Sequence, residues 1–331
     1  MGGTLNYLCL RRLEELLLGL NPQKGLQEYA EALRSFSEQT ETGDRLDLPE
    51  SVPDQVWQAV CCQKESCPEE DCPFFKRCFY WQLRHALRKA HIIVTNHALL
   101  LADLQTENTV LPKYDAVIID EAHNLEDVAT SAFSVAFSPQ VMNMYYRTGL
   151  QLYFNTRSVL PLPEAENLRA VLDRVIDEAN RYFPTIREYI GEFSLRIDEK
   201  NRHRFAQTDI LERLKKVQET LQDLHLGDDS EGEALAKNLR QYTNTLAENI
   251  ALILAADNPH YVFWGEMQYN EPSLQAAPLS VAEHLEEKFF SQVKSVILTS
   301  ATLTTEKSFA YFKERIGLNG AQELILGSPF N

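Results

Sequence analysis

The cysteines of this chain all lie in its N-terminal quarter, and they limit what that part can fold into. Six occur at positions 9, 61, 62, 67, 72 and 78, and none follows in the remaining 253 residues (331 − 78). Three of them share the stretch CPEEDCPFFKRC, residues 67–78. Thiols gathered in this way in a reducing compartment favour metal or iron–sulfur ligation over disulfides. We therefore expect a cysteine-ligated inorganic centre in this part of the chain.

The composition is typical of a globular protein outside the membrane. Hydrophobic residues make up 44% of the chain and charged residues 24%, and no apolar run reaches the roughly 20 residues that a membrane span needs. The N-terminal stretch MGGTLNYLCLRRLEELLLGL is interrupted by charges and has no small-residue cleavage site, which argues against a secretory signal. The sequence predicts a cytoplasmic protein with no membrane partner.

Charge is unevenly distributed along the chain. The formal net charge is −16, so the overall field repels nucleic acid and any contact with it has to be local. Between Pro73 and Ala102 there is no acidic residue. The five cations of this segment are Lys76, Arg77, Arg84, Arg88 and Lys89. Aromatic residues lie among them, and cations with stacking rings favour single-strand binding; the alternative is rings that pack a small domain beside a solvated basic helix.

Apolar runs and helical periodicity indicate how the chain is organised. HIIVTN (91–96) and Ala116–Ile119 have the composition of buried strands, and the helical HALLLADL between them predicts a parallel α/β core. From 131 to 257 long helical patterns dominate, with a break at LGDDSEGEA (226–234). Strand character returns in HYVFWGEM and in SVILTSATL. The α/β core is therefore expected to resume after a helical insertion.

An acidic pair ends the second of these strands. In VIIDEAHNLED, Asp120 and Glu121 directly follow four apolar residues. Phosphate chemistry needs one carboxylate to hold Mg²⁺ and another to orient or deprotonate an attacking water. We assign Asp120 to the metal and Glu121 to the base. The alternative for such a pair is a charged cap at a strand-to-helix turn.

Several stretches, in this order, resemble one helicase family. VIIDEAHNL looks like the DEAH-box motif of superfamily 2 helicases, and ILTSATL (297–303) looks like the motif that follows it there. NYLCLRRLEELL, CPEEDCPFFKRC and VTNHALLLADL are similar to the DinG branch of the XPD-like iron–sulfur helicases. The resemblance implies a partial RecA-like parallel-sheet motor domain with an iron–sulfur insertion and a mostly helical arch insertion. It also implies an ATP-dependent 5′-to-3′ DNA helicase that acts on single-stranded or forked DNA in repair or recombination.

The same resemblance implies the domain boundaries. We expect the iron–sulfur domain with its flanking helices at 1–91 and the DEAH part of the first motor domain at 92–130. The helical arch follows at 131–257. Residues 258–331 return to the motor domain and begin the link to a second one.

Cluster ligands also follow from the resemblance. Members of this family bind a [4Fe–4S] cluster through four cysteines, and the matching positions here are Cys9, Cys67, Cys72 and Cys78. Zinc is the main alternative, because Cys₄ sites suit it as well. Cys61 and Cys62 are surplus by this count and are expected to be buried apolar residues, Cys62 being the one that could displace a ligand.

The remaining site assignments again rest on the resemblance. His123 would relay the state of the nucleotide, ATP with Mg²⁺, to the second motif. There, the hydroxyl residues Thr299, Ser300 and Thr302 would link hydrolysis to movement of the DNA strand. Asn96 and His97 follow the first predicted strand, where family members approach nucleic acid. Helix capping is the alternative for the hydroxyls and for Asn96.

One motif that this family requires is missing. No G-x-x-x-x-G-K-[ST] phosphate loop occurs in the 331 residues, and such a loop cradles the phosphates of ATP. We therefore expect a piece of a helicase, truncated at both ends and without ATPase activity by itself. Two alternatives remain open: a non-catalytic iron–sulfur module that binds single-stranded DNA, and a zinc-held helical scaffold for protein partners.

Overall fold

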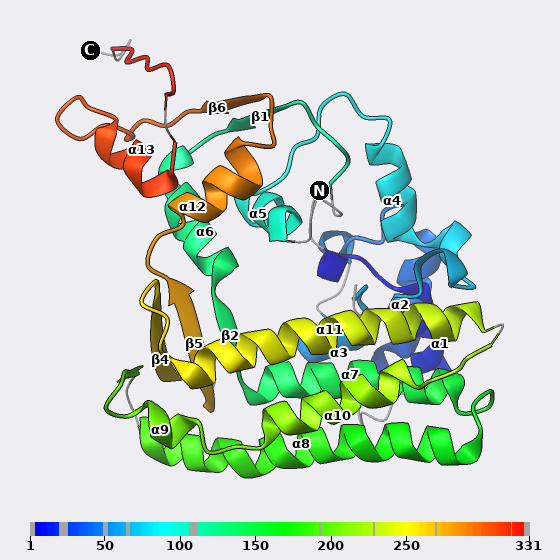
Figure 1. The fold of residues 1–331 in the computed structure, drawn as a ribbon. Helices are drawn as coiled ribbons and strands as arrows, with labels where there is room; N and C mark the ends of the chain where they lie inside the picture. The colour runs from blue at the N-terminus through cyan, green and yellow to red at the C-terminus, as the bar shows by residue number, and fades with distance from the viewer. Residues whose placement is uncertain are drawn as a thin grey trace. The chain divides into compact units, whose positions relative to one another are not determined.

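The chain forms two compact units, shown as ribbons in Figure 1. The computed structural model describes residues 4–19, 26–48, 52–63, 67–105, 111–191, 194–227, 229–268, 270–318 and 320–327. The first unit (1–93, 136–258 and 263–275) joins the cysteine-rich segment to the helical insertion. The second unit (94–135, 259–262 and 276–331) contains the DEAH strand and the TSAT turn.

Short helices around one apolar core build the cysteine-rich segment. They are α1 (Leu10–Leu17), α2 (Ala30–Gln39), α3 (Asp54–Val60) and α4 (Phe79–Leu87). Leu13, Leu33 and Phe36 lie at helical spacing on α1 and α2 and are buried in this core. An antiparallel bridge pairs Leu8 with Cys61. The chain that precedes α1 is therefore held against the end of α3.

Long amphipathic helices build the insertion. They are α7 (Pro139–Thr156), α8 (Leu162–Ile190), α10 (Ile210–Gln222) and α11 (Ser230–Ala255), with the short α9 (Arg202–Phe205) between α8 and α10. Gly149 of α7 approaches α8 so closely that an added Cβ would lie 2.5 Å from a methyl carbon of Leu172. The buried hydroxyls of Tyr145 and Thr243 hydrogen-bond at 2.9 Å and join α7 to α11.

A small four-stranded sheet accompanies these helices. Its strands β2 (Val135–Phe137), β3 (Leu195–Ile197), β4 (Tyr261–Gln268) and β5 (Glu271–Pro278) lie in the order β2-β5-β4-β3. β3 runs antiparallel to β4, with Ile197 opposite Phe263. Both of these side chains are buried, so the face of the sheet on which they lie is apolar where β3 and β4 pair.

The second unit contains a parallel strand pair with helices around it. Its elements are α5 (His97–Gln105), β1 (Ala116–Ile119), α6 (Leu125–Phe133), α12 (Ala282–Leu285), β6 (Ser295–Leu298) and α13 (Ala310–Ile316). β1 pairs in parallel with β6 from Ala116 opposite Ser295 to Ile119 opposite Leu298. The Glu126 carboxylate of α6 accepts from the Arg315 Nε of α13 at 2.7 Å.

The structure confirms a mixed α/β chain that is mostly helical and has a small parallel sheet. β1 forms over the four predicted residues, Ala116–Ile119. The strand predicted for HIIVTN is wrong: residues 91–96 form no strand, and Ile92 and Val94 are 84% and 79% exposed. An apolar run becomes a strand where a neighbouring backbone pairs with it, and the parallel sheet of the described residues consists of β1 and β6 alone.

A membrane span requires a helix that is both long and apolar. Within the described ranges, no helix combines the length and the apolar character needed to cross a bilayer.

Gly43 is a position where an alanine is expected to be poorly tolerated. Its φ is +65°, and an added Cβ would lie 2.4 Å from the ring of Phe79 in the cysteine-rich segment. We expect Gly43→Ala to lower the free energy of unfolding by about 2–4 kcal/mol, through left-handed strain and overpacking together. Urea unfolding measures this change.

Gly227→Ala is the matched control for that substitution. Gly227 also has a left-handed φ of +60°, but an added Cβ meets nothing within 4 Å. Only the backbone strain of about 1–2 kcal/mol is then expected. Equal losses for the two variants would contradict the close contact between Gly43 and Phe79.

Candidate functional sites

The acidic pair Asp120 and Glu121 lies at the carboxyl end of β1, beside the end of β6. The Thr299 N–H donates to the Ile119 carbonyl at 2.9 Å, and the Ala122 N–H donates to the Thr299 carbonyl at 3.0 Å. These backbone bonds continue the parallel pairing beyond the strands. They hold the DEAH turn and the TSAT turn side by side in the second unit.

Glu121 occupies a strained backbone conformation. Its φ and ψ are +48° and +44°, in the left-handed region that non-glycine residues rarely adopt. The Asp120 Oδ1 accepts from the Glu121 N–H at 3.0 Å, which helps to hold the turn. Strain of this kind costs about 1–3 kcal/mol and concentrates at functional positions.

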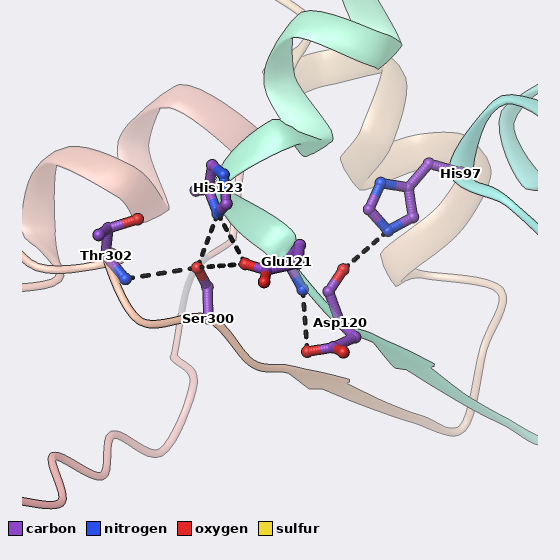
Figure 2. Close-up of polar contacts among 6 residues, drawn as sticks. All are labelled: His97, Asp120, Glu121, His123, Ser300 and Thr302. Atoms are coloured by element: carbon purple, nitrogen blue, oxygen red, sulfur yellow. Dashed lines mark hydrogen bonds and ion pairs between the residues drawn. The ribbon is translucent and has the colours of Figure 1, made fainter. Parts of the chain in front are cut away.

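Side chains of the two turns meet in one polar group, shown in Figure 2. The His123 Nδ1 lies 2.7 Å from the Ser300 Oγ and 3.2 Å from the Glu121 Oε2. The Ser300 hydroxyl donates to the Glu121 Oε2 at 3.4 Å, and it accepts from the Thr302 N–H at 3.3 Å. Ser300 is therefore the shared partner through which the TSAT turn contacts both Glu121 and His123. Thr299 takes part through its backbone.

Asp120 and Glu121 are suited to different chemical tasks. The Asp120 carboxylate is exposed at the strand end, and carboxylate oxygens are hard ligands of the kind that Mg²⁺ takes. The Glu121 carboxylate is oriented by His123 and Ser300, as a group that positions or deprotonates water has to be. The geometry is compatible with the predicted division of labour between the two residues.

Asn96 and His97 use polar atoms to position α5. The Asn96 Oδ1 accepts from the Leu99 N–H at 2.8 Å, which is the capping role that the sequence left as an alternative. The His97 Nε2 lies 2.9 Å from the Asp120 carbonyl oxygen, to which it donates (Figure 2). The Asn96 bond caps the start of α5, and the His97 bond attaches that start to the end of β1. A direct role of either residue in DNA binding stays a prediction.

The cysteines of the first unit share one neighbourhood. The charges of Cys9 and Cys78 each influence the titration of both Cys67 and Cys72, so the four predicted ligands lie near one another. The Cys62 thiol lies within hydrogen-bonding reach of the Cys9 and Cys78 sulfurs. Chiefly through this contact with Cys62, the pKa of Cys9 is lowered to about 6, and that of Cys78 is lowered as well. Burial raises the pKa of Cys67 to about 11.

Each of the four predicted ligand sulfurs also accepts a backbone N–H. The donors are Arg12 for Cys9, Glu69 for Cys67, Phe74 for Cys72, and Tyr80 and Trp81 for Cys78. Hydrogen bonds to sulfur stabilise thiolates and tune iron–sulfur centres. In the part of the chain that the structure describes, no three His, Cys, Asp or Glu side chains have the spacing of a closed metal site. The donor set fits a thiolate-ligated centre in chemistry, and the ligand assignment stays a prediction.

Two contacts join the helical insertion to the cysteine-rich segment within the first unit. The Asn238 Nδ2 of α11 donates to the Cys67 carbonyl at 2.9 Å. Arg11, buried on α1, lies 3.3 Å from Glu15 and 3.7 Å from Glu231 of α11. Asn238 and Glu231 were not predicted, because no local motif marks residues that meet across such distances in sequence.

The cations in and beside α4 differ in how far they are exposed to solvent. Lys76, Arg77, Arg88 and Lys89 are exposed. Arg84 instead lies over the rings of Tyr80 and Trp81, 5.8 and 5.2 Å from their centroids. Phe79 and Tyr80 are buried. Phe79 and Tyr80 therefore serve packing, which is the alternative raised from the sequence. The exposed cations remain the candidates for phosphate contact.

Comparisons with known proteins show sequence similarity between this chain and helicases. The DEAD_2 family model matches residues 53–142. The chain is 30% identical over 342 residues to the ATP-dependent DNA helicase YoaA of Escherichia coli K12, covering 99% of this chain and 51% of that protein. It is 26% identical to the ATP-dependent DNA helicase YoaA of Haemophilus influenzae, and this match covers 99% of this chain and 51% of that protein. It is 27% identical to the ATP-dependent DNA helicase DinG of Salmonella paratyphi A, and this match covers 87% of this chain and 45% of that protein.

A solved XPD helicase chain is also similar, with a TM-score of 0.37 and 14% identity, over 87% of this chain and 44% of the other. The chain spans about half the length of the curated relatives it matches. The family model and the sequence matches to YoaA and DinG confirm the resemblance to the DinG branch of DNA helicases.

Proposed function

We propose that this homologue of the YoaA and DinG helicases, with its DEAD_2 domain, acts as part of an ATP-dependent 5′-to-3′ DNA helicase. In this proposal the second unit belongs to a RecA-like motor domain. The iron–sulfur domain spans residues 1–91 and the helical arch spans 131–257, and the motor-domain parts span 92–130 and 258–331. ATP hydrolysis drives unwinding of DNA in repair or recombination, in the cytoplasm.

The observation that carries the motor assignment is the contact of Glu121 and His123 with Ser300. Two turns far apart in sequence meet at the carboxyl ends of paired parallel strands, where α/β proteins bind ligands. Asp120 would hold Mg²⁺, and Glu121 would orient the attacking water. The bonds of Ser300 to Glu121, His123 and the Thr302 N–H would link the nucleotide site to the TSAT turn.

Cys9, Cys67, Cys72 and Cys78 hold a [4Fe–4S] cluster in this proposal. The backbone N–H donors at each sulfur, and the proximity of all four thiols, support the assignment. A bound cluster supplies a rigid inorganic link between the segment before α1 and the segment before α4. The chain's own contribution is to orient the four thiolates and to keep them partly shielded from water.

ATP turnover tests how the motor residues act. We expect the 331-residue chain alone to show no DNA-stimulated ATPase, because no phosphate loop is present to hold the triphosphate beside Asp120. Release of inorganic phosphate, with and without single-stranded DNA, measures this. Turnover that disappears in Glu121→Gln would contradict the expectation and would show that these residues act without such a loop.

A second candidate is a non-catalytic iron–sulfur module that binds single-stranded DNA. The exposed cations of the α4 region favour DNA binding under either function. The two differ in what the gene encodes ahead of this sequence: a phosphate loop there supports the motor, whereas a gene without one supports the module. A zinc-held scaffold requires stoichiometric zinc and no salt-dependent DNA binding.

A further inference from the structure

A fifth thiol, that of Cys62, lies beside two of the four proposed ligands. The Cys62 thiol lies within hydrogen-bonding reach of Cys9 and Cys78, the first and the last of the four proposed ligands. The Cys62 N–H donates to the Tyr7 carbonyl at 2.8 Å, and its Sγ lies 3.7 Å from the Leu8 carbonyl. The backbone around Cys9 therefore fixes Cys62 beside the ligands, and its position does not depend on a flexible side chain alone.

Cys61 provides the internal comparison. It is next to Cys62 in the chain, but its side chain is only 1% exposed and belongs to the apolar core of the segment. Its thiol donates to the Gln58 carbonyl at 3.7 Å. Its backbone is extended, with φ −72° and ψ 159°, and successive side chains of an extended chain point to opposite sides. Of the two neighbouring cysteines, Cys62 is the one whose thiol lies within reach of proposed ligands.

We infer that Cys62 is a reserve ligand: when the thiolate of Cys9 or Cys78 is removed, Cys62 takes its coordination position. The inference rests on the proposed cluster. The step is a ligand exchange without electron transfer, in which Cys62 gives its thiol proton to solvent and its sulfur forms the bond to iron that the other sulfur has left. A thiol already in contact with two ligand sulfurs needs little backbone movement to do this.

The consequence is selective tolerance to ligand loss. Loss of Cys9 or Cys78 leaves four cysteines in the group, because Cys62 contacts both positions. A chain that loses Cys62 as well has only three. The cluster therefore depends on Cys62 only when one of the two contacted ligands is missing, and Cys62 alone is dispensable.

Iron and sulfide content of the anaerobically purified 331-residue chain tests the inference. We expect Cys62→Ala and Cys61→Ala to carry wild-type iron. Cys78→Ala is expected to retain about half or more of it, whereas Cys62→Ala/Cys78→Ala falls to about a tenth or less. The double variant Cys61→Ala/Cys78→Ala is the matched control, since it also lacks two cysteines, and it should behave like Cys78→Ala.

Three outcomes would overturn the inference. If Cys78→Ala loses as much iron as Cys62→Ala/Cys78→Ala, Cys62 does not replace a ligand. If Cys62→Ala alone loses the cluster, Cys62 is a primary ligand. If both double variants lose iron equally, the effect is structural. The pair Cys9→Ala and Cys9→Ala/Cys62→Ala repeats the test at the other contact, and far-UV circular dichroism verifies that each variant keeps its helices. A wild-type chain free of iron and sulfide would instead refute the cluster proposal itself.

Discussion

Replacing Cys72 with alanine is expected to lower the bound iron at least about tenfold and to leave the protein colourless. The wild-type chain, purified without oxygen, is expected to be brown and to hold about four iron and four sulfide ions. Cys72 is predicted to be a ligand, it accepts the Phe74 N–H, and burial raises the pKa of its thiol. A thiol that is costly to ionise when buried is stabilised as a thiolate by a bound cation.

The control for this variant is Cys61→Ala, which removes a cysteine from the same segment. Cys61 is buried in the apolar core, and its pKa is raised by that burial, so we expect no change in iron content. Iron, sulfide and zinc analysis of both variants and of the wild-type protein shows which metal the thiols hold. A colourless wild-type protein with one zinc ion per chain would show that the thiols hold zinc instead.

Local patterns predicted the elements that depend on local physics. Ala116–Ile119 formed as expected because an apolar run with three β-branched residues meets a parallel partner in Ser295–Leu298. The long helices of the insertion follow from apolar residues at helical spacing, such as Leu168 and Leu172 on α8. HIIVTN carries an equally apolar pattern and forms no strand. Pairing is a non-local property, and the pattern of one segment does not contain it.

The candidate site residues also differ in whether a local pattern could identify them. Asp120 and Glu121 could be identified from one short motif, because a strand end followed by a turn fixes their place. The bond between His123 and Ser300 spans 177 positions, and only the resemblance to helicases suggested that the two motifs meet. Arg84 was grouped with the solvent-facing cations, yet it lies over Trp81. Which cation of a basic helix stacks on a ring depends on rotamers that sequence spacing does not determine.

Charge reversal at Arg88 and Lys89 is expected to weaken binding of single-stranded DNA about tenfold to a hundredfold near 0.1 M salt. Both side chains are exposed at the end of α4, whereas Arg84 is engaged by Tyr80 and Trp81. Loss of two phosphate contacts should also make the dependence of log affinity on log salt shallower by about 1.4, since each contact to a single strand contributes about 0.7. Fluorescence anisotropy of a labelled oligonucleotide, over a range of salt concentrations, measures both quantities.

Lys215→Glu/Lys216→Glu is the matched control, because it changes the net charge by the same amount at two exposed cations of α10. In an acidic chain, an effect of net charge alone acts on both double variants alike, whereas a local contact acts on one. We therefore expect the control to keep the wild-type dependence of log affinity on log salt. It should lose only the small part of the affinity that comes from long-range attraction, because salt screens such attraction. Equal losses of affinity with equal slopes would mean that the α4 cations form a solvated helix face, and the strand would then have to be bound by other residues of the chain.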